Sequence, residues 1–321
     1  MKSTEELNKL YESQLKPALQ AIEGQRKILL AKYIICIVGA LASFACAFFL
    51  AGKYAFVFYL AIAAILGFGY YLFFVVKKQR RAYRAIFKHN VVKEIVRLIN
   101  PDWHYNSDGR ISETDYNSSQ LFNTRLDSYG GDDLIKGIIE KTDFQFSELH
   151  TQYKTTRTNS EGKTETDWHT VFKGLFAHAD FNKEIKGRTF ILPERASKAF
   201  RKYNLSAKDG GETELVKLEN PEFEKIFKVF STDQIESRYI LTPIMMEAMV
   251  NIYKKYKRRV HFSFIGSRVY VAMSFNKDLF EPRILKSGVR FEDMEQMNSQ
   301  FTLIQTLIHE MNLNTRIWTK N

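Results

Sequence analysis

The chain has 321 residues, of which 45% are apolar and 26% charged, proportions that are ordinary for a protein that buries a core. Its formal net charge of +11 would fit a nucleic-acid partner if the basic residues were spread over a folded domain. Its two cysteines, Cys36 and Cys46, lie within one apolar run, which excludes a disulfide framework and a cysteine metal site.

The positive charge is concentrated in one short segment. Residues 77–97 contain eight Lys and Arg against one Glu, whereas residues 98–321 contain 32 basic and 31 acidic residues. Nucleic-acid affinity depends on phosphate contacts across a binding face, and a balanced domain does not offer them. We therefore expect no nucleic-acid partner.

An apolar run from Tyr33 to Val76 predicts a transmembrane helical hairpin. As a single helix it would be about 66 Å long, roughly twice the thickness of the hydrocarbon core. Gly52-Lys53 divides it into spans at 33–51 and 54–76, with the only charge at the break. The alternative, a buried helix pair of a soluble protein, rarely runs this long without a charge. Small residues such as Gly39 and Ser43 would let the two helices approach closely.

The charges that flank the spans predict their orientation. Arg26, Lys27 and Lys32 precede the first span and five Lys or Arg closely follow the second, whereas the turn holds Lys53 alone. Positively charged flanks stay in the cytoplasm, so both termini are expected to be cytoplasmic. The apolar run starts too far into the chain and is too long to be the core of a cleaved signal peptide.

Residues 77–100 predict a basic helix next to the membrane, ended by Asn100-Pro101. Basic side chains at a bilayer surface are attracted to anionic lipid by about 1 kcal/mol each. The predicted headgroup contacts are Lys77, Lys78, Arg80, Arg81, Arg84 and Lys88. The alternative is that these charges only fix the topology of a two-pass protein.

Residues 1–32 predict a cytosolic amphipathic helix. Ser3 and Glu6 form a capping box, and apolar residues then recur at near-helical spacing from Leu7 to Ile22. Such a stripe must cover another apolar surface. The simplest partner is the helix after the second span, which would give an antiparallel stalk; an oligomeric coiled coil, and hence a homo-oligomer, is the alternative.

Residues 101–321 predict a cytosolic α+β domain with an antiparallel sheet and packed helices. Alternating segments from Leu134 to Pro193, joined by short polar loops such as "NSEGK", indicate a meander. The polar stretch 151–166 is expected to be a flexible hairpin tip at its rim, either a binding edge or disordered. "VHFSFIGSRVYVAM" predicts a hairpin with Gly266-Ser267 in its turn. "GGDD" at 130–133 is interpreted as a glycine turn entering a strand.

The stretch "FSTDQIESRYILTP", residues 230–243, resembles a catalytic cluster but is explained by helix capping. Ser231 with Gln234 is interpreted as a capping box, and Thr242-Pro243 begins the next helix. Asp233 and Arg238 stand where a helix dipole favours their charges.

Candidate chemistry is sparse. His309-Glu310 lacks the second histidine of a zinc-protease helix, and phosphate-binding loops and nucleophile elbows are missing, so no cofactor is predicted. One alternative metal site combines nitrogen and oxygen ligands: His150, His169, His178 and Asp180.

Four segments together resemble a known family: "GGDDLIKGIIEKTDFQFSEL", "FKGLFAHADFNKEIKGRTFILP", "LENPEFEKIFKVFSTDQIESRYILTPIMMEAM" and "VHFSFIGSRVYVAM". Over residues 105–285 the chain is similar to the bacterial family called domain of unknown function 3137. The resemblance implies a two-pass protein of the bacterial inner membrane with a cytosolic domain. It also implies a membrane-protein partner of the LemA type, from the family's gene neighbourhood, and it supplies no activity.

The first hypothesis is therefore a membrane-anchored interaction or scaffold domain that binds a protein partner or anionic lipid. The second is a membrane-tethered, metal-dependent hydrolase that uses the histidine set. A pore is disfavoured because neither span carries an ionisable residue to line one.

Overall fold

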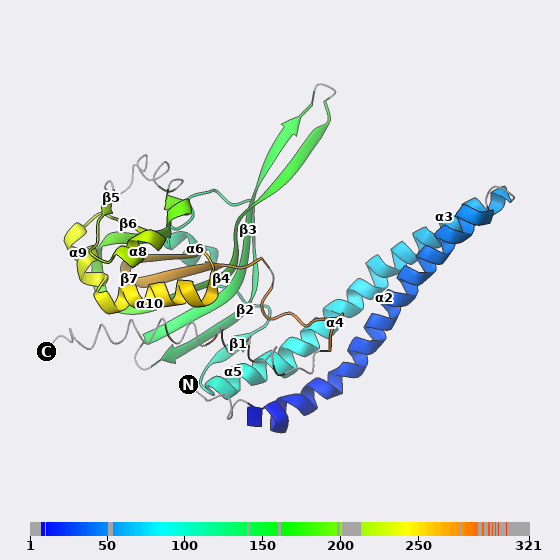
Figure 1. Cartoon of the computed structure of the whole chain (residues 1–321), viewed down its shortest axis with the longest axis horizontal. Helices are drawn as coiled ribbons and strands as arrows, with labels where there is room; N and C mark the ends of the chain where they lie inside the picture. Colours follow the sequence, from blue (N-terminus) through cyan, green and yellow to red (C-terminus); the bar gives the residue numbers. More distant parts are fainter. Residues whose placement is uncertain are drawn as a thin grey trace. The chain divides into compact units, whose positions relative to one another are not determined.

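The computed structural model describes residues 8–9, 11–50, 54–139, 142–159, 162–197, 200, 213–276, 278–287, 291, 295, 297, 299, 301 and 306. It confirms an α+β protein in which helices precede an antiparallel sheet (Figure 1). Contacts divide the chain into two compact units: Met1–Ile99 with Phe280–Asn298, and Asn100–Leu279 with Ser299–Asn321. We call them the hairpin unit and the sheet unit.

The hairpin unit is built from two long antiparallel helical arms. The first arm is a short π-helical turn, η1 (Tyr11–Leu15), followed by α2 (Lys16–Leu50). The second arm consists of α3 (Ala55–Tyr70), η2 (Tyr71–Val76), α4 (Lys77–Phe87), η3 (Lys88–Val92) and α5 (Lys93–Ile99). The residues at its joints have right-handed helical backbone angles: Tyr71, Lys77, Lys88 and Lys93. The second arm therefore continues through its π-helical turns.

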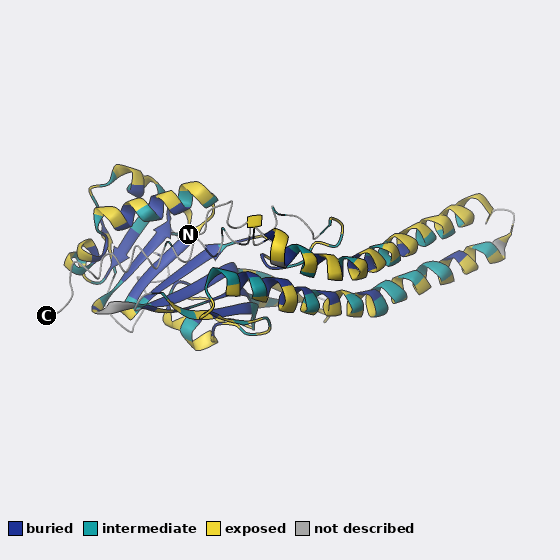
Figure 2. Ribbon diagram, turned by 90° about the horizontal axis from the view of Figure 1, so that it is seen from below, coloured by how far each residue is buried: buried dark blue, intermediate teal, exposed yellow. Residues whose placement is uncertain are grey.

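Both arms contain a stretch long and apolar enough to cross a membrane. Only 6% of the most apolar window of the first arm and 11% of that of the second are buried within the protein. A core helix of a soluble protein buries most of such a window, whereas most residues of these windows are exposed or partly exposed, as the mainly yellow and teal ribbons of the arms show (Figure 2). The two predicted spans therefore correspond to two exposed apolar helices.

The arms pack closely together at Gly39. A Cβ atom added there would lie 2.4 Å from the ring of Phe68, so a larger residue would force that ring to move. The hydroxyl of Ser43, one turn later, donates to the Gly39 carbonyl at 2.8 Å. The predicted close approach at this pair of small residues is confirmed.

Beyond the apolar stretches, the arms bury a conventional helix–helix interface that we call the stalk. Leu19, Ile22 and Leu29 on α2 are buried, as are Tyr83 and Phe87 on α4. Lys32 Nζ donates to Gln79 Oε1 at 2.9 Å across the two arms. The predicted antiparallel packing of the N-terminal helix on the helix after the second span is confirmed.

A segment from the far end of the sequence belongs to this stalk. Arg26, held by Glu23 at 2.7 Å, donates from Nη1 to the carbonyl of Ile284 at 2.6 Å. The Ser287 hydroxyl donates to Glu23 Oε1 at 3.3 Å, the same oxygen that Arg26 Nη2 contacts. The sequence had placed these residues in the sheet domain, because no local pattern marks their return to the helices.

The sheet unit contains one antiparallel sheet in the order β1-β2-β3-β4-β6-β5, with β7 paired to β4. Its strands are β1 (His104–Asn106), β2 (Ser128–Ile139), β3 (Thr142–Thr158), β4 (Thr164–Pro193), β5 (Glu214–Val216), β6 (Phe227–Ser231) and β7 (Val260–Ser274). The predicted meander corresponds to β2, β3 and β4, which pair consecutively. "GGDD" lies inside β2, so its interpretation as a turn was wrong.

β7 doubles back on itself, as the sequence predicted. Its ends meet where Ser274 N donates to the Arg259 carbonyl at 3.0 Å, and Gly266 at the tip has a φ of 61°. One arm pairs with Gly174–Asp180 of β4 and the other with Ile185–Ile191. The hairpin is therefore held between the two halves of β4.

β3 and β4 also continue past the rest of the sheet as a two-stranded ribbon (Figure 1). Their pairing extends to Thr158 and Thr164, and Gly162 N donates to the Asn159 carbonyl at the tip. Among the described residues, the polar stretch 151–166 that was predicted as a hairpin tip is thus mostly paired strand.

Four helices of the sheet unit begin at side-chain caps. They are α6 (Glu113–Ser118), α8 (Pro221–Ile226), α9 (Gln234–Ile240) and α10 (Pro243–Tyr256), capped by Ser112, Asn220, Asp233 and Thr242. The predicted cap Ser231 was wrong: Asp233 accepts from the amides of Ile235 and Glu236, and Ser231 instead accepts from the Asp233 amide. Thr242-Pro243 is confirmed as a helix start.

Aromatic side chains dominate the core of the sheet unit. Tyr116 stacks on Phe122 and contacts Phe176, and Phe190 packs on Phe200. Phe176, Phe190 and Tyr116 are at most 1% exposed. This core holds together the strands β2, β3, β4, β6 and β7.

Candidate functional sites

Four exposed cations follow directly on the second apolar stretch. Val76 closes η2, and Lys77, Lys78, Arg80 and Arg81 occupy the first turns of α4 with exposed side chains. Long basic side chains in this position can reach out from an apolar helix into a polar layer. Lys77 Nζ already lies 4.4 Å from the centre of the Phe73 ring, one turn back into the apolar stretch.

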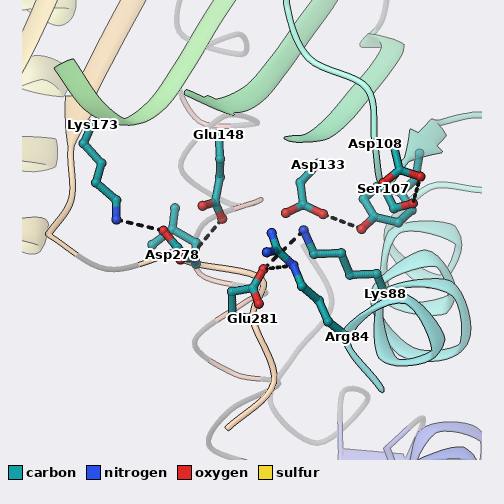
Figure 3. A network of polar contacts seen from close by, with 11 residues as sticks. Arg84, Lys88, Ser107, Asp108, Asp133, Glu148, Lys173, Asp278 and Glu281 are labelled. Atoms are coloured by element: carbon teal, nitrogen blue, oxygen red, sulfur yellow. Dashed lines mark hydrogen bonds and ion pairs between the residues drawn. The ribbon is translucent and has the colours of Figure 1, made fainter. Parts of the chain in front are cut away.

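The other two predicted headgroup residues, Arg84 and Lys88, lie against a carboxylate instead. Both form ion pairs with Glu281, and the Lys88 Nζ to Glu281 Oε1 distance is 3.4 Å (Figure 3). The Lys88 side chain is only 3% exposed. Because a buried ammonium needs a compensating charge, we interpret Lys88 as a structural residue of the stalk, and the headgroup prediction is retained for the four exposed cations.

The histidine set predicted as a metal site is distributed along two paired strands. His150 faces Lys173 across β3 and β4, whereas His169 and His178 stand nine residues apart on β4. At about 3.3 Å per residue that separation is about 30 Å. His169 Nε2 contacts Thr155 Oγ1 at 2.8 Å, and His150 Nε2 contacts Thr170 Oγ1 at 3.3 Å. The register therefore does not bring these residues to one ion.

His178 is the most buried member of that set, at 1% exposure. Its Nδ1 lies 2.9 Å from Nη1 of Arg268, which must be the donor, and Asp180 lies two residues further along the same strand. Burial, together with the Arg268 guanidinium, lowers the pKa of His178 to about 4. The imidazole is neutral at pH 7 and serves as an acceptor within the sheet.

Three carboxylates that the sequence did not bring together form a cluster on β2 and β3. Ligand oxygens of Asp132, Asp133 and Glu148 all lie within 4.8 Å of one another. Asp132 pairs directly with Glu148, and a bulge after Asp132 gives Asp133 a φ of 57°. The bulge interrupts the usual alternation, so consecutive aspartates can reach the same cluster.

The carboxylates of this cluster are hydrogen-bonded within the sheet unit. Tyr105 donates its hydroxyl to Asp133 Oδ1 at 2.5 Å, and Glu148 Oε1 accepts from the Leu279 amide at 2.7 Å. Burial and the Asp133 charge both raise the pKa of Tyr105, which keeps it a donor. Such oxygens are the ligand type that Ca²⁺ and Mg²⁺ prefer, but their recorded bonds serve to fix β2, β3 and the chain after β7.

A neighbouring ion pair extends this polar network. Lys173 Nζ lies 3.0 Å from Asp278 Oδ1, close to Glu148 (Figure 3).

The sequence signal for the carboxylate cluster was "GGDD". At Gly131 a Cβ atom would lie 2.3 Å from the Glu148 carbonyl, so the close approach of β2 and β3 requires glycine there.

Comparisons with known proteins give the family resemblance and little more. The model of a family described as "Protein of unknown function (DUF3137)" matches residues 170–313, which confirms the resemblance over that stretch. No curated protein matches. A crystal structure of the mycobacterial trehalose monomycolate transport factor A, TtfA, aligns over 67% of this chain and 93% of its own, at 9% identity and a TM-score of 0.31. A similarity this low does not indicate a shared function.

Proposed function

We propose that this protein is a membrane-anchored scaffold, with its helical hairpin in the bacterial inner membrane and both termini in the cytoplasm. The observation that carries the proposal is the exposed apolar surface of the two arms, followed at once by four exposed cations. An apolar surface of this extent needs an apolar solvent, and the cations favour the cytoplasmic side. The sheet unit would then present its surface to a protein partner near the bilayer.

The basic residues would contact anionic headgroups. Lys77, Lys78, Arg80 and Arg81 are exposed and, among the described contacts, none of them forms an ion pair with an acidic side chain. Each is expected to contribute about 1 kcal/mol of attraction to an anionic surface. Arg84 and Lys88 are excluded from this set because Glu281 compensates them.

Anchoring is tested by washing membranes that contain the full-length protein with high salt and then with alkaline carbonate. A protein whose hairpin crosses the bilayer stays in the pellet through both washes. Release by salt alone would contradict the proposal, because it would show attachment through the basic residues without the hairpin.

Headgroup contact is tested by measuring phosphatidylglycerol retained by the protein after release from mixed phosphatidylglycerol and phosphatidylcholine nanodiscs, using native mass spectrometry. Replacing Lys77, Lys78, Arg80 and Arg81 by Gln should remove the preference for the anionic lipid. A matched control replaces four exposed cations of the sheet unit by Gln: Lys154, Arg157, Lys186 and Lys225. Equal loss in both variants would contradict a local contact.

The partner proposed from the family resemblance is a membrane protein of the LemA type. Affinity purification of the full-length protein in mild detergent should recover such a partner at fixed stoichiometry. Recovery of the chain with itself only would favour a homo-oligomer in place of a scaffold. A metal-dependent hydrolase built on His150, His169, His178 and Asp180 is not proposed, because the strand register separates these residues.

A further inference from the structure

The β4 strand has an unpaired edge along the β3–β4 ribbon. β3 occupies one side of β4 as far as Thr164. β7 occupies the other side only from Gly174 onward, and the Phe275 amide donates to the Lys173 carbonyl at 2.9 Å. In the described part of the chain, no strand pairs with this other side from Thr164 to Thr170, a stretch that we call the free edge. Amides and carbonyls that point outward from such an edge are available to another strand.

The other edge of the ribbon, on β3, is partly covered. The Asp127 amide donates to the Gln152 carbonyl at 3.0 Å, and the Lys154 amide donates to Asp127 Oδ2 at 2.9 Å. These bonds use backbone groups of β3 where the ribbon leaves the rest of the sheet. The free edge of β4 is therefore the longer of the two open edges.

The ribbon has little core of its own. Of residues 154–158 and 164–170, all except Thr155 and His169 are exposed, and Trp168 is 51% exposed. A two-stranded ribbon without a packed face is only marginally stable in water. A third strand would bond to the free edge and stabilise the ribbon, as in complexes where an extended peptide adds a strand to a sheet.

The two faces of the ribbon differ in charge. Alternate residues of a strand share a face, and the stacking of Tyr153 on His169, with ring centres 4.8 Å apart, identifies one of them. On the free edge this face also carries the two carboxylates of Glu165 and Asp167. The opposite face carries uncharged side chains on the free edge: Thr164, Thr166, Trp168 and Thr170.

The acidic face is only partly neutralised within the ribbon. Arg157 lies opposite Glu165, but the residue opposite Asp167 is Thr155. Opposite charges at facing positions of neighbouring strands stabilise the pairing, whereas like charges destabilise it. A strand added to the free edge is therefore expected to place Lys or Arg on this face.

The uncharged face favours a different kind of neighbour. Trp168 lies opposite Lys154 of β3, and threonines stand two positions away from it on either side. Aromatic rings pair favourably with β-branched side chains on a neighbouring strand. A matching strand therefore alternates basic residues with β-branched ones.

We propose that the free edge binds an extended segment of a protein partner, in which basic residues alternate with β-branched residues, as an additional strand of the sheet. The basic residues would face Glu165 and Asp167, and the β-branched residues would contact Trp168. The inference rests on the proposed scaffold role, because it names the surface that a protein partner would use. The membrane washes test anchoring and peptide binding in detergent tests the free edge, so the two can fail separately.

The test measures binding of a fluorescent peptide to the full-length protein in mild nonionic detergent by anisotropy, with detergent micelles alone as the blank. The peptide alternates lysine and valine and matches the free edge in length. One control peptide has glutamate in place of lysine. Another keeps the lysines but has every backbone nitrogen methylated, so it cannot donate main-chain hydrogen bonds.

We expect saturable binding of one lysine peptide per chain. Each control peptide should bind at least about tenfold more weakly, because it loses either the charge pairs or the main-chain hydrogen bonds. Equal binding of the methylated peptide would show charge attraction without strand pairing and would overturn the proposal. The absence of saturable binding above the blank would overturn it as well.

A charge-reversed variant locates the site. Glu165→Lys combined with Asp167→Lys should weaken the lysine peptide about tenfold or more and should strengthen the glutamate peptide, which also shows that the edge remains folded. The matched control reverses two exposed acidic residues of the sheet unit outside the ribbon, Glu219→Lys with Glu247→Lys, and should change neither. An unchanged preference in the edge variant, loss of both peptides, or the same change in the control would contradict strand addition at this edge.

Discussion

The two units of this chain place the same residue type in opposite surroundings. In the hairpin unit Phe48 and Phe49 are 74% and 78% exposed, whereas Phe146 and Phe176 of the sheet unit are fully buried. Each arm of the hairpin contacts essentially one other arm, so most of its circumference remains uncovered. A sheet with helices and loops on it covers its aromatic face with protein. Apolar content alone therefore does not identify a core; what the element packs against does.

The units also differ in how they handle charge. The sheet unit holds buried carboxylates in hydrogen-bonded clusters, such as Asp133 with Tyr105. The hairpin unit leaves four cations exposed beside an apolar surface. Substitutions in the two units, and at positions within one unit that differ in burial, test this difference.

The largest effect is expected for an aromatic deletion. Phe176→Ala leaves a cavity in the sheet core and should lower its free energy of unfolding by about 3–5 kcal/mol. Phe48→Ala removes the same side chain from an exposed position and should change the unfolding free energy by less than about 0.5 kcal/mol. Urea denaturation in nanodiscs, followed by tryptophan fluorescence, measures both. Equal losses would contradict the assignment of Phe48 to an exposed surface.

An intermediate effect is expected for pH. The pKa of His178 is about 4 in the folded protein and 6.5 without perturbation, so the unfolded chain binds the proton more readily. The contribution of the neutral His178 side chain to the free energy of unfolding is fully present above pH 6.5 and is lost as the pH falls towards 4. From pH 7 to pH 5 the wild type should lose about 2 kcal/mol more than His178→Phe, measured by urea denaturation at both values. An identical pH dependence would show that His178 titrates normally.

The smallest effect is expected at the helix contact. Gly39→Ala places a methyl group against Phe68 and should destabilise the pairing of the arms by about 1–2 kcal/mol. Phe68→Ala in the same chain should restore part of that loss by making room. Thermal unfolding of the hairpin in nanodiscs, compared with Gly67→Ala, which meets nothing within 4 Å, measures the difference. If both glycine variants behave alike, the close approach is not a constraint.

The features that the sequence predicted correctly depend on local patterns. The length of the apolar run predicted the two apolar arms, and the alternation of apolar and polar residues predicted β2 to β4. The predicted break at Gly52-Lys53 lies outside the described residues. Gly266-Ser267 gave the β7 hairpin, because its turn chemistry lies within the hairpin itself. The position of β7 between the two halves of β4 could not be predicted, since it depends on pairing between distant segments.

The candidate sites were mostly hidden because they depend on such distant contacts. Glu281 lies almost two hundred residues from Lys88, and nothing local indicates that the two are paired. Glu148 meets Asp132 and Asp133 through strand register and a bulge. The histidine set was wrong for the opposite reason. Its residues were grouped because they are close in sequence and suit a metal, whereas the strand geometry separates them.

The unbroken second arm has a consequence for where a partner can act. The 23 residues from Lys77 to Ile99 continue the helical arm for about 35 Å at 1.5 Å per residue. The chain passes into the sheet unit at Asn100, so a partner of that unit is separated along the chain from the apolar stretch by this helical length. Each helical turn removed from Lys77–Ile99 would shorten that separation by about 5.4 Å.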